Sequence, residues 1–123
     1  MNADVIVIKE YPEGTKFING TPFLQAHGNS MLNATNPKRS IPNGSWVALK
    51  SIPAEMLQWG EVYAFEDIDG INAIKKIMPS EKEGCIKCVS FNEDDYPPFD
   101  IPKKDIISSF CLVMGVVTVK MFN

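Results

Sequence analysis

The segment EVYAFEDIDGINAIKKI, residues 61–77, contains two runs of strand-forming side chains around Asp69-Gly70. This dipeptide is typical of the tight turn of a β-hairpin. Successive side chains of a strand point to opposite faces, so alternate residues of the second run share a face. Lys75 therefore lies with small and apolar neighbours, which are Ile71, Ala73 and Ile77. The other face carries Asn72, Ile74 and Lys76, and we expect Lys76 to be a solvated surface charge.

The position of Lys75 bears on its chemistry. A lysine normally titrates near a pKa of about 10.4, which is too high for a base at neutral pH. Burial disfavours the charged amine and lowers that pKa, so a lysine on an apolar face can accept a proton from a serine. The hairpin alone favours the simpler alternative, in which Lys75 extends its amine to the sheet edge.

The rest of the chain predicts a mostly β, single domain over residues 1–123. Short apolar runs alternate with turn signals from nine prolines and eight glycines. We expect strands at residues 5–8, 23–25, 46–49, 61–65, 71–77, 85–91 and 111–120. One short helical turn is expected in SIPAEMLQWG, with Ser51 as its cap, Pro53 at its start and Gly60 at its end.

Composition excludes several classes of protein. The formal net charge is −3 and no basic stripe is visible, so the chain does not resemble a nucleic-acid-binding domain. Three cysteines without a signal peptide indicate a reducing, cytoplasmic location. The most apolar stretch, residues 110–119, is too short to span a bilayer as a helix.

Five motifs follow one another in an order that resembles a known family. They are HGNSM (27–31), IPNGSWVALK (41–50), the hairpin, IKCVSFNEDDYPPFDI (86–101) and CLVMGVVTVK (111–120). The series resembles the C-terminal peptidase domain of LexA, of UmuD-type proteins and of phage repressors. The resemblance runs from roughly His27 to Lys120 and implies the compact, mostly β fold that this family shares with signal peptidase.

The resemblance also implies a catalytic site. Ser30 matches the family nucleophile and Lys75 matches its general base, forming a Ser-Lys dyad. The oxyanion would be bound by the backbone N–H groups of Ser30 and Asn29. Gly28 would let the nucleophile turn adopt a tight conformation. No cofactor and no metal is implied.

The function implied is a serine peptidase domain of a LexA-like or phage-type transcriptional repressor that cleaves itself. The alternatives are a non-cleaving repressor dimerisation domain and a UmuD-type DNA polymerase accessory protein. A signal peptidase relative would need a membrane anchor, which these residues lack. The implied partners are a second copy in a homodimer, the protein's own linker as substrate, and a RecA filament as trigger. DNA would be contacted only through an N-terminal domain absent from these 123 residues.

Three features depart from the family pattern. The turn Asn43-Gly44-Ser45 replaces the usual Gly-Asp type, and residues 33–41 form an inserted loop. Its Lys38-Arg39 pair either contacts a partner or is a solvated tip. No Ala-Gly or Cys-Gly cleavage dipeptide precedes Ser30; the Xaa-Gly bonds there are Glu13-Gly14, Asn19-Gly20 and His27-Gly28. A fragment, a cleavage product and a stand-alone relative all fit this.

Other constellations have simpler explanations. His27 is too close to Ser30 along the chain to form a Ser-His-Asp arrangement with it. Cys85 and Cys88 have CxxC spacing, but three steps along a strand place their thiols on opposite faces. The carboxylates of Asp67, Asp69 and residues 93–95 lack the spacing of a calcium loop. The apolar residues near the C-terminus predict either a dimer interface or a central strand buried on both faces.

Overall fold

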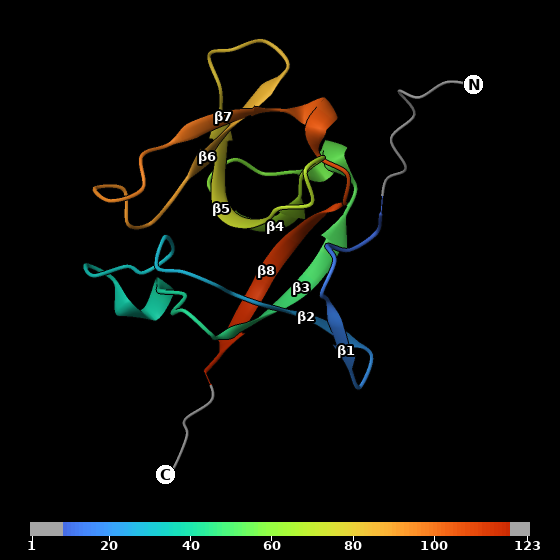
Figure 1. Ribbon diagram of the computed structural model, residues 1–123, viewed down its shortest axis with the longest axis vertical. Coiled ribbons are helices and arrows are strands. Elements are labelled where there is room, and N and C mark those ends of the chain that lie inside the picture. The colour runs from blue at the N-terminus through green and yellow to red at the C-terminus, as the bar shows by residue number, and fades with distance from the viewer. Residues whose placement is uncertain (1–8, 119–123) are drawn as a thin grey trace.

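The computed structural model describes residues 9–118, and these form one antiparallel sheet of eight strands (Figure 1). The strands are β1 Lys16–Ile18, β2 Thr21–Gln25, β3 Trp46–Ile52, β4 Val62–Glu66, β5 Asn72–Pro79, β6 Cys85–Val89, β7 Phe99–Pro102 and β8 Phe110–Val117. Their order across the sheet is β1-β2-β3-β8-β4-β5-β6-β7. Three short 3-10 turns complete the described part: η1 Pro37–Arg39, η2 Ala54–Met56 and η3 Lys103–Asp105. The mostly β fold is confirmed.

Six of the expected strands are present, with modest differences at their ends. The expected strand at residues 5–8 lies outside the described residues, as do residues 119–120 of the last one. Two strands were not expected. The first, β1, has three exposed residues and therefore no buried face to reveal it. The second, β7, begins directly after Pro98 and ends at Pro102, and prolines at both positions are typical of turns.

The helical turn differs from the expectation. Ser51 is part of β3 because the pairing of β3 with β8 continues through Ser51↔Cys111 and Ile52↔Phe110. Pro53 is the extended residue before η2, not its first helical residue, and Leu57 already caps the other end, before Gly60. Only one 3-10 turn, Ala54–Met56, remains of the expected helix.

The hairpin at Asp69-Gly70 is confirmed, with a longer loop than a two-residue turn. β4 and β5 pair from Val62↔Lys76 to Glu66↔Asn72. The Asp67 carbonyl accepts the N–H of Gly70 at 2.9 Å, and within this loop Gly70 is the residue with a positive φ, +80°. Asp67 Oδ1 accepts the N–H groups of Asp69 and Ile71, so this carboxylate stabilises the turn. Ile71 lies in this loop and is 60% exposed, so it does not extend the apolar face of β5.

The centre of the sheet is buried on both faces. Along β4, Val62 and Ala64 belong to one apolar cluster, while Tyr63 and Phe65 belong to another. β8 pairs with β3 over its whole length but with β4 over only two residues. The sheet bends there, and Figure 1 shows β4 to β7 curling above β8, with β3 alongside β8 and β1 and β2 below. The segment between β2 and β3 faces the β6–β7 loop across this bend (Figure 1).

Candidate active site

Ser30 lies in the segment that follows β2, and a second turn holds this segment in place. The Gly28 N–H donates to the Asn43 side-chain oxygen at 2.8 Å. Ala26 pairs with the same turn through two backbone hydrogen bonds, to Gly44 and Ser45, each of 2.8 Å. Gly28 has φ +87°, which favours glycine, so the expected tight conformation is confirmed. The unusual Asn43-Gly44-Ser45 turn is therefore the support of the segment that carries Ser30.

Lys75 lies in β5, opposite Tyr63 of β4. The β5–β6 pairing begins at Lys76↔Val89, so one step further places Lys75 beside Ser90. The Lys75 amine donates to Ser30 Oγ at 2.7 Å and to Ser90 Oγ at 2.9 Å. The structure thus brings Ser30 and Lys75 together, and the amine points to two hydroxyls instead of extending to the sheet edge.

The environment of Lys75 favours its neutral form. Burial lowers the pKa of this amine and is the larger effect, while Cys88 acts in the opposite direction. The Cys88 thiol is itself fully buried, which raises its pKa to about 12 and keeps it neutral. Among the described residues, no carboxylate forms an ion pair with Lys75. The Tyr96 ring, 5.9 Å from the amine, is the aromatic group that favours the charged form.

Asn29 and Ser30 present backbone donors that are unused. Within residues 9–118, neither of their N–H groups has a hydrogen-bond acceptor. Asn29 lies at the exposed surface, so its N–H is accessible. Their carbonyl groups are engaged: the Asn92 N–H donates to Ser30 at 3.0 Å and the Asn92 side-chain amide donates to Asn29 at 3.3 Å. Free donors next to a serine are what an oxyanion requires.

A cleft of about 480 Å³ opens beside Ser30 and Lys75. Its apolar wall is formed by Leu24, Met31, Ile41, Trp46 and Ile74. His27 lines the cleft and is exposed, but in the described part of the chain it makes no hydrogen bond with Ser30. The cleft is therefore built mainly from the Ser30 segment, β2 and the start of β5.

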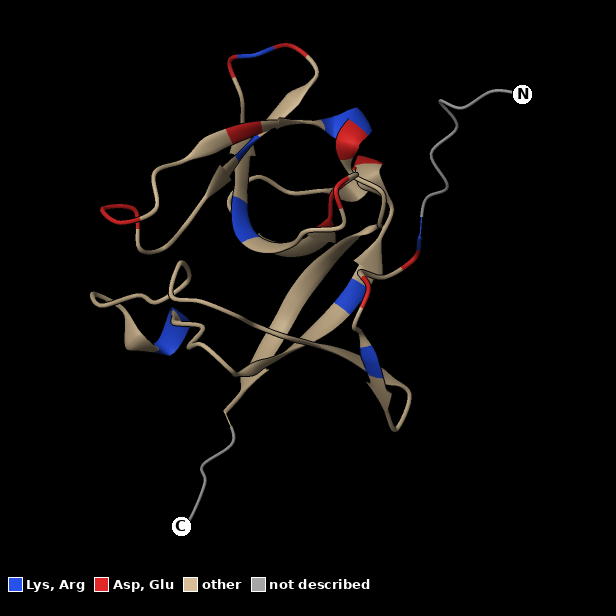
Figure 2. Ribbon diagram, in the orientation of Figure 1, with Lys and Arg blue, Asp and Glu red and all other residues tan. Residues whose placement is uncertain are grey.

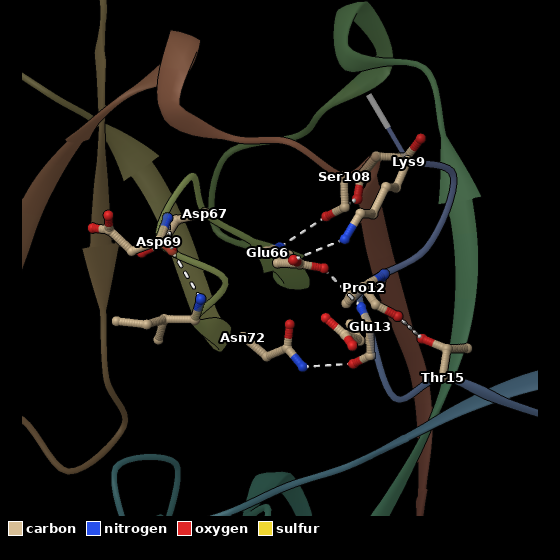
Figure 3. Close-up of polar contacts among 11 residues, drawn as sticks. Lys9, Pro12, Glu13, Thr15, Glu66, Asp67, Asp69, Asn72 and Ser108 are labelled. Carbon is tan, nitrogen blue, oxygen red and sulfur yellow. Dashed lines mark hydrogen bonds and ion pairs between the residues drawn. The ribbon is translucent and has the colours of Figure 1, made fainter. Parts of the chain in front are cut away.

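The segment before β1 also contributes to the cleft, through Glu13 and Gly14. Figure 3 shows how it is anchored: the buried Glu66 carboxylate accepts the Glu13 N–H at 2.8 Å and pairs with Lys9 at 3.2 Å. The Asn72 side chain donates to the Glu13 carbonyl at 2.7 Å (Figure 3). This anchor links one wall of the cleft to β4 and β5.

Three residues of the site were given no role there from the sequence: Ser90, Asn92 and Asn43, although the turn that contains Asn43 was noted. Ser90 could be found only from the β5–β6 register, which places it beside Lys75. Asn43 and Asn92 act through contacts with residues far along the chain, and a single sequence carries no signal for such contacts. Lys76 also differs from the expectation: it is half-buried, and its face carries the buried Ile74.

The other side chains considered from the sequence, which are the cysteines, the carboxylates and the Lys38-Arg39 pair, do not form a site in the described residues. Cys88 is fully buried and Cys85 is partly exposed. Within residues 9–118, no three side chains of His, Cys, Asp or Glu gather as metal ligands would. Lys38 and Arg39 are exposed in η1, and Figure 2 shows the basic residues scattered over several elements. The residues of the described part form no helix of the length and apolarity needed to cross a membrane.

Comparison with known proteins bears directly on this site. No curated protein matches the chain. The family described as Peptidase S24-like matches residues 3–118, which is nearly the whole chain. That span includes Ser30, Lys75 and every element of the sheet. The chain belongs to the Peptidase S24-like family.

Proposed function

We propose that this chain is a Ser-Lys serine peptidase domain. The observation that carries the proposal is the 2.7 Å hydrogen-bond distance between Lys75 Nζ and Ser30 Oγ, next to two backbone donors that have no acceptor in the described residues. A desolvated amine at hydrogen-bond distance is a suitable base for a serine hydroxyl. Membership of the Peptidase S24-like family supports the same chemistry.

In the proposed reaction, Lys75 accepts and returns the proton at each step. Ser30 Oγ attacks the peptide carbonyl while its proton passes to neutral Lys75, and the oxyanion accepts from the N–H groups of Ser30 and Asn29. Lys75 then gives the proton to the leaving amine as the C–N bond breaks. Water hydrolyses the resulting ester by the same route, and the proton returns to Ser30.

An extended peptide is the substrate that the cleft fits best. Residues 72–75 of β5 pair with β4, but in the described structure their other edge has no strand partner because β6 begins to pair at Lys76. β2 also has an open edge beyond residue 23, because β1 pairs only with residues 21–23 of β2. The cleft lies beside both open edges, which can donate and accept backbone hydrogen bonds from a bound strand.

We further propose that the natural substrate is the protein's own linker, so that cleavage inactivates a LexA-like or phage-type repressor. Of the three Xaa-Gly bonds before Ser30, Glu13-Gly14 and His27-Gly28 contribute both residues to the cleft. The Glu13 carbonyl is bound by Asn72, so in this conformation it is not presented to Ser30. DNA contact and a RecA trigger stay predictions.

The experiment is acylation by p-nitrophenyl acetate, followed by release of p-nitrophenolate and by peptide mapping of the acetyl group. We expect the acetyl group on Ser30, and we expect Ser30→Ala and Lys75→Ala each to abolish its attachment there. His27→Ala is the control and should react like the wild type. Acylation of the wild type elsewhere but not at Ser30 would refute the proposal.

A non-cleaving dimerisation domain is the second candidate. Met114, Val116 and Val117 near the end of β8 are 59%, 39% and 50% exposed. Adjacent exposed apolar residues on a paired strand favour an interface with a second copy. Sedimentation should show a concentration-dependent dimer that Met114→Lys weakens, and a monomer at every concentration would exclude this role.

A further inference from the structure

One short segment contacts both halves of the proposed dyad. Ser90, directly after β6, has its hydroxyl 2.9 Å from the Lys75 amine. Two residues on, the backbone N–H of Asn92 donates to the Ser30 carbonyl at 3.0 Å, and its side chain donates to the Asn29 carbonyl at 3.3 Å. Residues 90–92 thus connect the proposed base to the two peptide groups around the nucleophile.

The contact with Asn29 has a geometric consequence for Ser30. The carbonyl and N–H of a trans peptide point in opposite directions, and no described peptide bond is cis. A carbonyl of Asn29 held towards Asn92 therefore directs the N–H of Ser30 to the other side. The Leu32 N–H also donates to this carbonyl, at 3.3 Å, so within residues 9–118 Asn92 supplies one of the two donors that fix its direction.

We propose that Asn92 is a positioning residue for the oxyanion site, acting through the peptide group between Asn29 and Ser30. Its side-chain amide keeps the Ser30 N–H directed at the oxygen on which negative charge develops. If this peptide group turned over, a carbonyl oxygen would replace the donor and would repel the oxyanion. The inference rests on the proposed Ser-Lys activity of the same site.

The test measures acylation by p-nitrophenyl acetate across pH. The bond from Ser30 Oγ to the acetyl carbon forms, the ester bond to p-nitrophenolate breaks, and the proton passes to Lys75. We expect Asn92→Ala to lower the plateau rate about 10-fold, less than the roughly 100-fold loss of a whole oxyanion donor. Because Asn92→Ala leaves the Lys75 contacts in place, the midpoint of its pH profile should stay at the wild-type value.

Asn92→Asp is a nearly isosteric variant that loses the amide donor, and it should be slower than the wild type by at least the same factor. Asn33→Asp is the matched control. It makes the same charge change three residues from Ser30, but the Asn33 side-chain oxygen acts as an acceptor, for the Asn36 N–H and the Thr35 hydroxyl. An aspartate keeps that function, so the control should acylate within about twofold of the wild type.

Phenylboronic acid gives a second readout, because its adduct with a serine is a tetrahedral boronate anion that places one of its hydroxyl oxygens at the oxyanion position. Asn92→Ala should weaken its binding by about the same factor as the plateau rate. Three results for Asn92→Ala would each overturn the inference: a plateau rate of acylation equal to that of the wild type, an unchanged affinity for the boronate, or a shifted midpoint of the pH profile. Acylation at Ser30 that Lys75→Ala does not impair would instead overturn the proposed function, so the two failures are distinct.

Discussion

The Lys75 amine lies 2.7 Å from the Ser30 hydroxyl although 45 positions separate them in the chain. Two independent features create this approach. The β5–β6 register places Ser90 beside Lys75, and the Asn43 side chain holds the turn that leads to Ser30. The contact is therefore built from sheet pairing on one side and from a turn on the other. A change in either should move the two groups apart without removing them.

The first prediction concerns the pH dependence of acylation. Burial lowers the pKa of Lys75 below its ordinary value of 10.5, and only the neutral amine accepts a proton. The rate should rise about tenfold per pH unit below that pKa and level off above it, before pH 10.5. Lys75→Arg should be inactive at every pH because a guanidinium stays protonated. A flat profile in the wild type would contradict the role of Lys75 as base.

A second prediction follows from the same pKa direction and concerns stability. Between the lowered pKa and 10.5 the unfolded chain binds a proton at Lys75 that the folded chain does not. The wild type therefore gains stability as pH rises through this window, and the burial penalty is fully present below it. In Lys75→Met this gain is absent, so its Tm should fall relative to the wild type as pH rises. Lys76→Met removes the neighbouring charge and should keep the wild-type dependence.

How far the sequence predicts the site depends on which contacts are local. Alternation along β5 correctly placed Lys75 with Ala73 and Ile77, because that pattern is a property of the strand itself. It fails for Lys76, because the face of β5 that carries Lys76 is also covered, by the apolar cluster that contains Ile74. β4 shows the reason: with both faces buried, alternation no longer marks a solvent side.

The pairing of Ser30 with Lys75 is predicted by the resemblance of the motifs to a known family, and not by the alternation of side chains along a strand. Ser90 and Asn92 could not be found in the same way, because their roles depend on register and on a contact across the bend of the sheet. β1 was missed because its three residues are all exposed and give no periodic signal. Local rules therefore predict which strands exist, whereas the support of the site requires the three-dimensional pairing.

A third prediction concerns Ser90. It is almost completely buried, and its hydroxyl is the second partner of the Lys75 amine. Ser90→Ala frees the amine to rotate away from Ser30, and a displacement of about 1 Å can cost up to roughly 100-fold in rate. We expect slower acylation with little loss of stability, about 1 kcal/mol. Ser90→Thr keeps a hydroxyl at the same position and should retain more activity than Ser90→Ala; equal losses in both would argue against this role.

The last prediction concerns the anchor at Glu66, which holds the segment bearing Glu13 and Gly14 against the cleft. Lys9→Ala leaves the buried carboxylate with the Glu13 N–H as its remaining donor, and we expect a loss of about 2 kcal/mol in the free energy of unfolding. Glu66→Gln still accepts from Glu13 but carries no charge that needs a cation. Lys9→Ala made in the Glu66→Gln background should therefore cost less than half as much. Denaturant unfolding of the four proteins gives this cycle, and additive losses would show that the two side chains do not interact.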